Sequence, residues 1–192
     1  MNTENFNFLD KLTCRHRLAM TAKYIERNDV VLDFGCGVQH YLLRWGRDKF
    51  KVGYGLDYDV KSCQEGNMHL INYKFQSNLP FEKDFFNKVF LLAVLEHIEE
   101  TDAQALFSEF SRVLKKDGRI IITIPTLRGK AVLELLALKL KILSFEEISD
   151  HKHYYNEKEI SDLARANGLK VVYSRLFQLG LNSLYVIEKK GC

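Results

Sequence analysis

The sequence predicts an α/β fold: a mostly parallel sheet of seven strands, helices on both faces, and an antiparallel hairpin at the C-terminal end. Short apolar runs alternate with amphipathic stretches through the first two thirds of the chain, which is typical of βα units. The last two apolar runs, over 169–177 and 183–189, have no helix between them and therefore predict an antiparallel pair.

Length and composition predict one domain. The 192 residues are enough for one core and too few for two ordinary ones. We expect a single domain over 1–192, with a helical cap over 1–28 and an inserted helix and substrate-side loop over 126–156. The net charge of +3 is modest and no basic block stands out, so no nucleic-acid partner is expected.

The cysteines and the N-terminal residues indicate a cytoplasmic setting. The four cysteines form no CxxC pair and have no zinc-like spacing with histidines, so we expect reduced thiols and no metal site. Met1 is not followed by a positively charged leader. No apolar run reaches the roughly 18 residues that a membrane span needs.

Each element of the first half follows from its own pattern. Residues 30–34 are largely β-branched and end at glycines, which predicts the first strand, and residues 51–56 alternate in polarity up to Asp57. Leu18, Ala22 and Ile25 share one helical face. The expected elements are, in order, a helix over 13–27, a strand over 30–34, a helix over 41–46, a strand over 51–56 and a weaker strand over 70–75.

The second half begins with a continuous apolar run over 88–94, which predicts a central strand buried on both faces. Asn156 is a good N-cap, and Asn167 with Gly168 ends the helix that it starts. The other expected elements are a helix over 101–114, a strand over 119–124 and a strongly apolar helix over 130–143.

A nucleoside-binding site is predicted at the end of the first strand. Gly35 and Gly37 allow the chain to turn tightly after Asp33 and to approach a ligand closely. Ligands of open α/β sheets bind at this carboxyl edge. Asp57 ends the second strand, 22 residues beyond Gly35, where its carboxylate can accept hydrogen bonds from ribose hydroxyls.

The run Asp33-Phe34-Gly35-Cys36-Gly37 resembles the first motif of class I S-adenosylmethionine-dependent methyltransferases of the type 11-like kind. Four further matches follow in the family's order: Gly-Tyr-Gly-Leu-Asp at 53–57, Leu-Pro-Phe at 79–81, Val-Leu-Glu-His-Ile at 94–98 and Leu-Lys-Lys-Asp-Gly-Arg at 114–119. The resemblance covers about residues 30 to 125. It implies a Rossmann-like fold, methyl transfer from S-adenosylmethionine, and S-adenosylhomocysteine as product.

The resemblance also implies a set of cofactor contacts. The glycines approach the methionine part, Asp57 holds the ribose and Tyr58 flanks the adenine. The residues carried over are Asp33, Gly35, Cys36, Gly37, Asp57, Tyr58, Phe75, Gln76, Val94 and Leu95. Two departures stand out: 75–78 contain no acid for the adenine amine, and Gln39 stands where the family often has a third glycine. A nicotinamide site would want a glycine at His40.

Three histidines are candidate general bases on the methyl-acceptor side. His97 directly follows the fourth strand, and His151 and His153 precede the last helix together with two tyrosines. The alternatives are a structural or cofactor-shaping role for His97 and solvated histidines beside packed tyrosines at 151–155. On the first helix, Arg15, His16 and Arg17 form either a solvated basic face or a group that reaches the cofactor's carboxylate.

The predicted function is methyl transfer to a small-molecule acceptor, such as a saccharide or lipid precursor. Two alternatives stay open: a cofactor-binding module without activity, and an RNA methyltransferase with a basic groove. The apolar helix over 130–143 has three interpretations, namely a lid, a homodimer contact, or peripheral contact with a membrane or lipid-linked acceptor.

Overall fold

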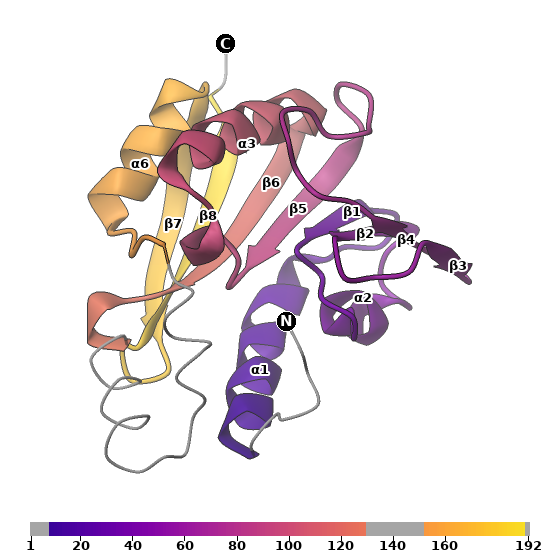
Figure 1. Cartoon of the computed structure of the whole chain (residues 1–192), viewed down its shortest axis with the longest axis horizontal. Helices are drawn as coiled ribbons and strands as arrows, with labels where there is room; N and C mark the ends of the chain where they lie inside the picture. The colour runs from indigo at the N-terminus through magenta and orange to yellow at the C-terminus, as the bar shows by residue number, and fades with distance from the viewer. Residues whose placement is uncertain (1–7, 130–151, 191–192) are drawn as a thin grey trace.

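The computed structural model describes residues 8–129 and 152–190 and contains an eight-stranded sheet of order β3-β4-β2-β1-β5-β6-β8-β7 (Figure 1). The strands are β1 (Val30–Phe34), β2 (Val52–Asp57), β3 (Cys63–Glu65), β4 (Met68–Asn72), β5 (Phe86–Leu92), β6 (Leu114–Pro125), β7 (Leu169–Phe177) and β8 (Asn182–Lys189). Strands β4, β2, β1, β5 and β6 are parallel, whereas β8 is antiparallel to both β6 and β7. The mostly parallel sheet with a C-terminal hairpin is confirmed.

The strand count differs from the prediction by one. The additional strand, β3, is three exposed residues that pair antiparallel with β4 through a turn at Gly66. No apolar alternation marks so short an edge strand, so the count of seven was one too few. Strand β4 also lies earlier than the expected 70–75, because the side chain of Asn72 turns away to bind the carbonyl oxygens of Tyr58 and Val60 at 2.7 and 2.9 Å.

The helices are α1 (Phe8–Thr21), η2 (Ala22–Tyr24), α2 (Tyr41–Gly46), η3 (Leu95–His97), α3 (Glu100–Val113) and α6 (Glu157–Ala166). The first helix was expected over 13–27, but its α-helical part ends at Thr21, whose hydroxyl donates to the Arg17 carbonyl oxygen at 2.9 Å. Asn156 caps α6 as predicted, within a capping box completed by Glu159. The expected helix over 130–143 lies outside the described residues.

Two apolar layers cover the two faces of the sheet. Helices α3 and α6 contribute to one buried cluster, and α1, η2 and α2 contribute to the other. Within β5, Val89 and Leu91 enter the first cluster while Phe90 enters the second, and all three are fully buried. The continuous apolar run is therefore a central strand with a core on each side, as predicted.

The sheet changes direction of growth between β1 and β5. Successive parallel strands add on one side of β1 as β2 and β4, and on its other side as β5 and β6. The carboxyl ends of β1 and β5 thus flank a topological switch point, where open α/β sheets bind their ligands.

Candidate cofactor site and acceptor side

The turn after β1 depends on two glycines for different reasons. Gly35 (φ +72°) and Gly37 (φ +65°) both lie in the left-handed region, which favours glycine. A Cβ on Gly35 would come within 2.9 Å of Val94 Cγ1 and closer still to its Cγ2, whereas a Cβ on Gly37 would meet nothing within 4 Å. Gly35 therefore lets the end of β5 approach the turn, and Gly37 borders open space that a ligand can use.

Asp57 lies beside this turn, as its spacing predicted. The amide of Gly37 donates to Asp57 Oδ2 at 2.8 Å, and the amide of Asp59 donates to Oδ1 at 2.9 Å. Each carboxylate oxygen has a further lone pair, so hydroxyl donors can still bind. The hydrogen bond to Gly37 also holds the turn against β2, independently of any ligand.

Buried charge concentrates beneath the turn. Asp33 is 3% exposed, and its burial, together with the negative charge of Asp57, raises the pKa of the Asp33 carboxyl to about 7. Burial and the same two carboxylates also raise the pKa of the Cys36 thiol. A thiol that stays protonated is a poor nucleophile, so Cys36 is a small turn residue.

The residues predicted to flank the adenine differ in exposure. Phe75 is half-buried and packs edge-on against Phe34, with ring centroids 6.1 Å apart, whereas Tyr58 and Gln76 are exposed. Val94 contacts the turn at Gly35. The side chain of Leu95 is fully buried in the core on the α3 and α6 face.

Helix α1 brings a positive charge, Arg17, within electrostatic reach of Glu96, which the sequence motifs alone do not reveal. Arg17 Nε and Glu96 Oε2 are buried atoms with no hydrogen-bond partner among the described residues. Burial raises the pKa of the Glu96 carboxyl to about 7, opposed by the positive charge of Arg17, and burial lowers the pKa of Arg17. Figure 1 shows α1 at the end of the sheet toward which β5 points.

The three basic residues of α1 are thus not equivalent. Arg15 and His16 are exposed, and the His16 ring packs edge-on against Phe177 with centroids 5.8 Å apart. Arg17 is different because its Nε is buried and it interacts with Glu96. The interpretation of a solvated basic face therefore holds for Arg15 and fails for Arg17.

The candidate bases lie on two adjoining segments. His97 ends η3, three residues after Val94, and its amide donates to the Val94 carbonyl oxygen at 3.0 Å. The amides of Lys152 and His153 both donate to the Glu96 carbonyl oxygen, at 2.7 and 3.3 Å. The segment before α6 is therefore held against η3. His151 lies outside the described residues.

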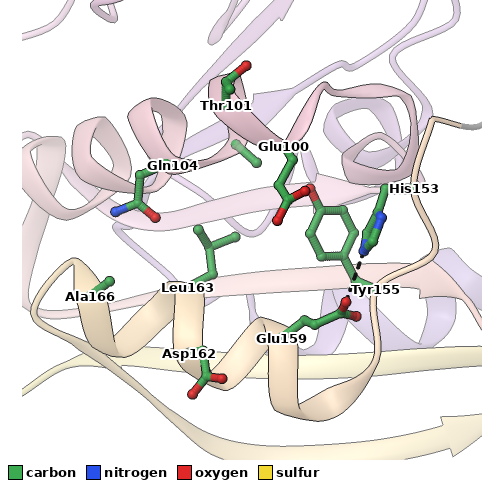
Figure 2. A pocket seen from close by; sticks show the side chains of 10 residues that line it. Glu100, Thr101, Gln104, His153, Tyr155, Glu159, Asp162, Leu163 and Ala166 are labelled. Atoms are coloured by element: carbon green, nitrogen blue, oxygen red, sulfur yellow. Dashed lines mark hydrogen bonds and ion pairs between the residues drawn. The ribbon is translucent and has the colours of Figure 1, made fainter.

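His153 lies on the α3 and α6 face of the sheet. Its Nε2 is 3.1 Å from Glu159 Oε1, and its ring packs edge-on against Tyr155 with centroids 4.5 Å apart. These three side chains line a groove between α3 and α6 that none of the predicted cofactor residues lines (Figure 2). Of the two described candidate bases, His97 is the one that does not line this groove.

Glu96 and His97 belong to one sequence motif, but they differ in burial in the structure. Glu96 is 2% exposed and His97 is half-buried. Three residues before Glu96, Ala93 has a positive φ of 58° and donates its amide to the Thr123 carbonyl oxygen at 2.8 Å. An acid placed directly after a continuous apolar strand was the one sequence signal for a buried carboxylate here.

The chain matches the family model described as "Methyltransferase domain" over residues 6–174. It is 25% identical over 192 aligned positions to an uncharacterized protein of Methanocaldococcus jannaschii, covering 94% of this chain and 70% of that protein.

Two solved structures resemble the fold. One belongs to the complex between the Haloferax volcanii Trm112 methyltransferase activator and a putative methyltransferase, with a TM-score of 0.71 at 19% identity over 93% of this chain and 89% of the other. The other is the methyltransferase CalO1 of calicheamicin biosynthesis with S-adenosylhomocysteine bound, with a TM-score of 0.70 at 14% identity over 95% and 55% of the two chains.

Proposed function

Because this chain belongs to the family of methyltransferase domains, we propose that it transfers a methyl group from S-adenosylmethionine to a small-molecule acceptor. S-adenosylmethionine is the cofactor of this fold, and when bound it supplies a methyl group on a sulfonium leaving group. The observation that carries the proposal is the pair of buried carboxylates of Asp33 and Glu96, together with the buried Nε of Arg17.

These charges suit the amino-acid end of the cofactor. Arg17 Nε is an unused donor and Glu96 Oε2 an unused acceptor, and each such buried group costs about 1–3 kcal/mol while it has no partner. A zwitterionic ligand with one carboxylate and one ammonium group offers a partner to both. We assign the guanidinium of Arg17 to the carboxylate and the carboxylates of Asp33 and Glu96 to the ammonium.

Asp57 holds the ribose in this proposal. Its carboxylate is already oriented by the amides of Gly37 and Asp59, at 2.8 and 2.9 Å, so little reorganisation precedes binding. Bidentate acceptance of two vicinal hydroxyls by one carboxylate is a strong, charge-assisted contact. We assign Phe75 and Tyr58 to the adenine, as the family resemblance implies.

For methyl transfer the protein mainly aligns donor and acceptor, which can supply roughly 7–11 kcal/mol of the barrier. A base adds about 10²–10⁴-fold where the acceptor loses a proton. We propose His97 for that proton, because η3 begins next to Val94, which contacts the turn at Gly35.

The small-molecule part of the proposal is supported by the charge of the chain. RNA methylation predicts a basic groove, whereas the net charge is a modest +3 and no basic block stands out. No described helix is long and apolar enough to cross a membrane.

Arg17→Ala tests the cofactor half of the proposal, with Arg15→Ala as a matched control on the same helix. We expect the Kd for S-adenosylhomocysteine, measured by calorimetry, to rise at least tenfold in the first variant, because a charge-assisted pair is worth about 1.5–3 kcal/mol. The Kd of the Arg15→Ala control should stay within twofold of the wild-type value. Equal Kd values in both variants would remove Arg17 from the site.

Turnover with methyl-labelled S-adenosylmethionine tests the transfer half. Saccharides, lipid precursors and RNA are offered separately, and the label is expected in a small-molecule product. If the acceptor loses a proton, His97→Ala should lower the turnover rate about 10²-fold or more while the Kd for the cofactor stays unchanged. Label in RNA would establish the alternative acceptor. Cofactor binding without any labelled product would support a non-catalytic module.

A further inference from the structure

A groove of about 600 Å³ lies between α3 and α6, on the face of the sheet opposite α1. Figure 2 shows that its lining comes from three segments: the first turns of α3, the residues just before α6, and one side of α6. The function proposed above uses none of its acidic residues. Their arrangement points to a separate ligand.

The groove contains a buried hydroxyl that lacks a hydrogen bond. Tyr155 is 7% exposed, and its Oη has no hydrogen-bond partner among the residues that the structure describes. The ring is held in place by the core on one side and by the edge-on contact with His153 on the other. A polar atom that is fixed and left without a partner in the wall of a groove is available to an occupant.

The acidic residues that line the groove differ in whether their carboxylates already form hydrogen bonds or ion pairs. Glu159 accepts from the Asn156 amide at 2.7 Å and lies 3.1 Å from His153 Nε2, so both its oxygens are engaged. Asp162 forms ion pairs with Lys158 and Arg165. Glu100 has neither a hydrogen bond nor an ion pair within the described residues, which leaves its carboxylate for an occupant.

The polar groups of Glu100 and Tyr155 lie close together in the groove. Figure 2 shows the Glu100 carboxylate and the Tyr155 hydroxyl pointing toward one another. Burial raises the pKa of Tyr155 to about 12, and the negative charges of nearby carboxylates, Glu100 foremost, add to this increase. The hydroxyl therefore stays protonated. No lysine or arginine is among the described residues that line the groove.

We propose that this groove binds a primary alkylammonium group, with the Glu100 carboxylate and Tyr155 Oη as its two anchors. An ammonium has three donors and no acceptor, which matches the Glu100 carboxylate and a lone pair of the Tyr155 hydroxyl and leaves one donor for water. Apolar atoms of Leu163 and two alanines line the rest of the groove, where methylene groups can pack.

An ammonium fits these anchors better than a divalent cation does. Calcium takes six to eight oxygen ligands and favours several carboxylates, and Glu100 is the one lining carboxylate that the described residues leave unused. The same ammonium chemistry has two sources, a free polyamine and the lysine side chain of a protein. The experiment below separates them.

Calorimetric titration of the whole chain tests the proposal with three probes: putrescine, spermidine and Nα-acetyl-lysine methylamide. We expect at least one probe to bind. Glu100→Gln should weaken that binding at least tenfold and Tyr155→Phe severalfold. Asp102→Asn is the matched control, because Asp102 is an exposed acid in the same turn of α3 that does not line the groove. The Kd of this variant for the probe should stay within twofold of the wild-type value.

The outcomes are distinct. Tighter binding of a polyamine identifies a small-molecule site, whereas tighter binding of the lysine derivative identifies a peptide-docking site. No binding of any probe at millimolar concentration overturns the proposal, as does equal weakening in Glu100→Gln and Asp102→Asn, which would indicate general surface charge. Binding of Ca²⁺ or Mg²⁺ without binding of the amines also overturns it. Circular dichroism of each variant confirms that it is folded.

Discussion

The glycine turn and the groove between α3 and α6 are two polar regions on one sheet, and they are built in opposite ways. At the turn, backbone amides orient Asp57, and the carboxylates of Asp33 and Glu96 and the Nε of Arg17 are buried. In the groove, most charges are partly exposed and already paired, and one buried hydroxyl lacks a partner. Buried charges depend strongly on a ligand that compensates them, whereas partly exposed ones depend on it weakly.

The largest effect is expected from Gly35→Ala. A side chain there is strained by the positive φ and collides with Val94, so the free energy of unfolding should fall by about 3 kcal/mol and cofactor binding should be lost. Gly66→Ala is the control, because it has a similar φ of 63° in open space, and it should cost about 1 kcal/mol. Urea unfolding measures both. Equal losses would mean that contact with Val94 is unimportant.

A pH series distinguishes the buried charges at the turn from the exposed ones in the groove. An acid whose pKa is higher in the folded state binds more protons folded than unfolded, so stability falls as pH rises from about 4 to 7. Asp33 and Glu96, each raised to about 7, should contribute such a fall, at most about 1.4 kcal/mol per pH unit each.

Asp33→Asn isolates one of these contributions, since other titrating groups cancel in the difference from the wild type. The fall in the free energy of unfolding between pH 5 and 7 should be shallower in the variant. Urea titrations at pH 5, 6 and 7 give the two slopes, and identical slopes would show that folding does not raise the pKa of Asp33.

The smallest effect is expected from Tyr155→Phe without any ligand. Removing a hydroxyl that has no hydrogen bond should leave the free energy of unfolding unchanged or raise it by up to about 1 kcal/mol. Tyr185→Phe provides the contrast, because the hydroxyl of Tyr185 hydrogen-bonds Ser183 and its loss should cost about 1 kcal/mol. Thermal and urea unfolding compare the two. A clear loss in Tyr155→Phe would reveal an internal partner for its hydroxyl.

Much of the fold was predictable because its signals are local. The continuous apolar run of β5, the glycines after β1 and the cap at Asn156 each predict structure through neighbours a few residues away. Strand β3 was missed because three exposed residues at a sheet edge have no periodic pattern. Helix α1 gives way to the 3-10 turn η2 after Thr21, whose hydroxyl bonds back to the Arg17 carbonyl oxygen, and propensity does not predict this change.

The sequence by itself determined the order of strands and helices, the turn at Gly35 and Gly37, and the arrival of Asp57 beside it, since strand ends and residue spacing specify these. Only the tertiary structure decided that the charge of Arg17 acts on the buried carboxyl of Glu96 and that the Glu100 and Tyr155 side chains point toward one another in the groove. Those pairs join residues 79 and 55 positions apart. Burial and charge compensation between such distant residues follow from how the layers pack, which no local pattern encodes.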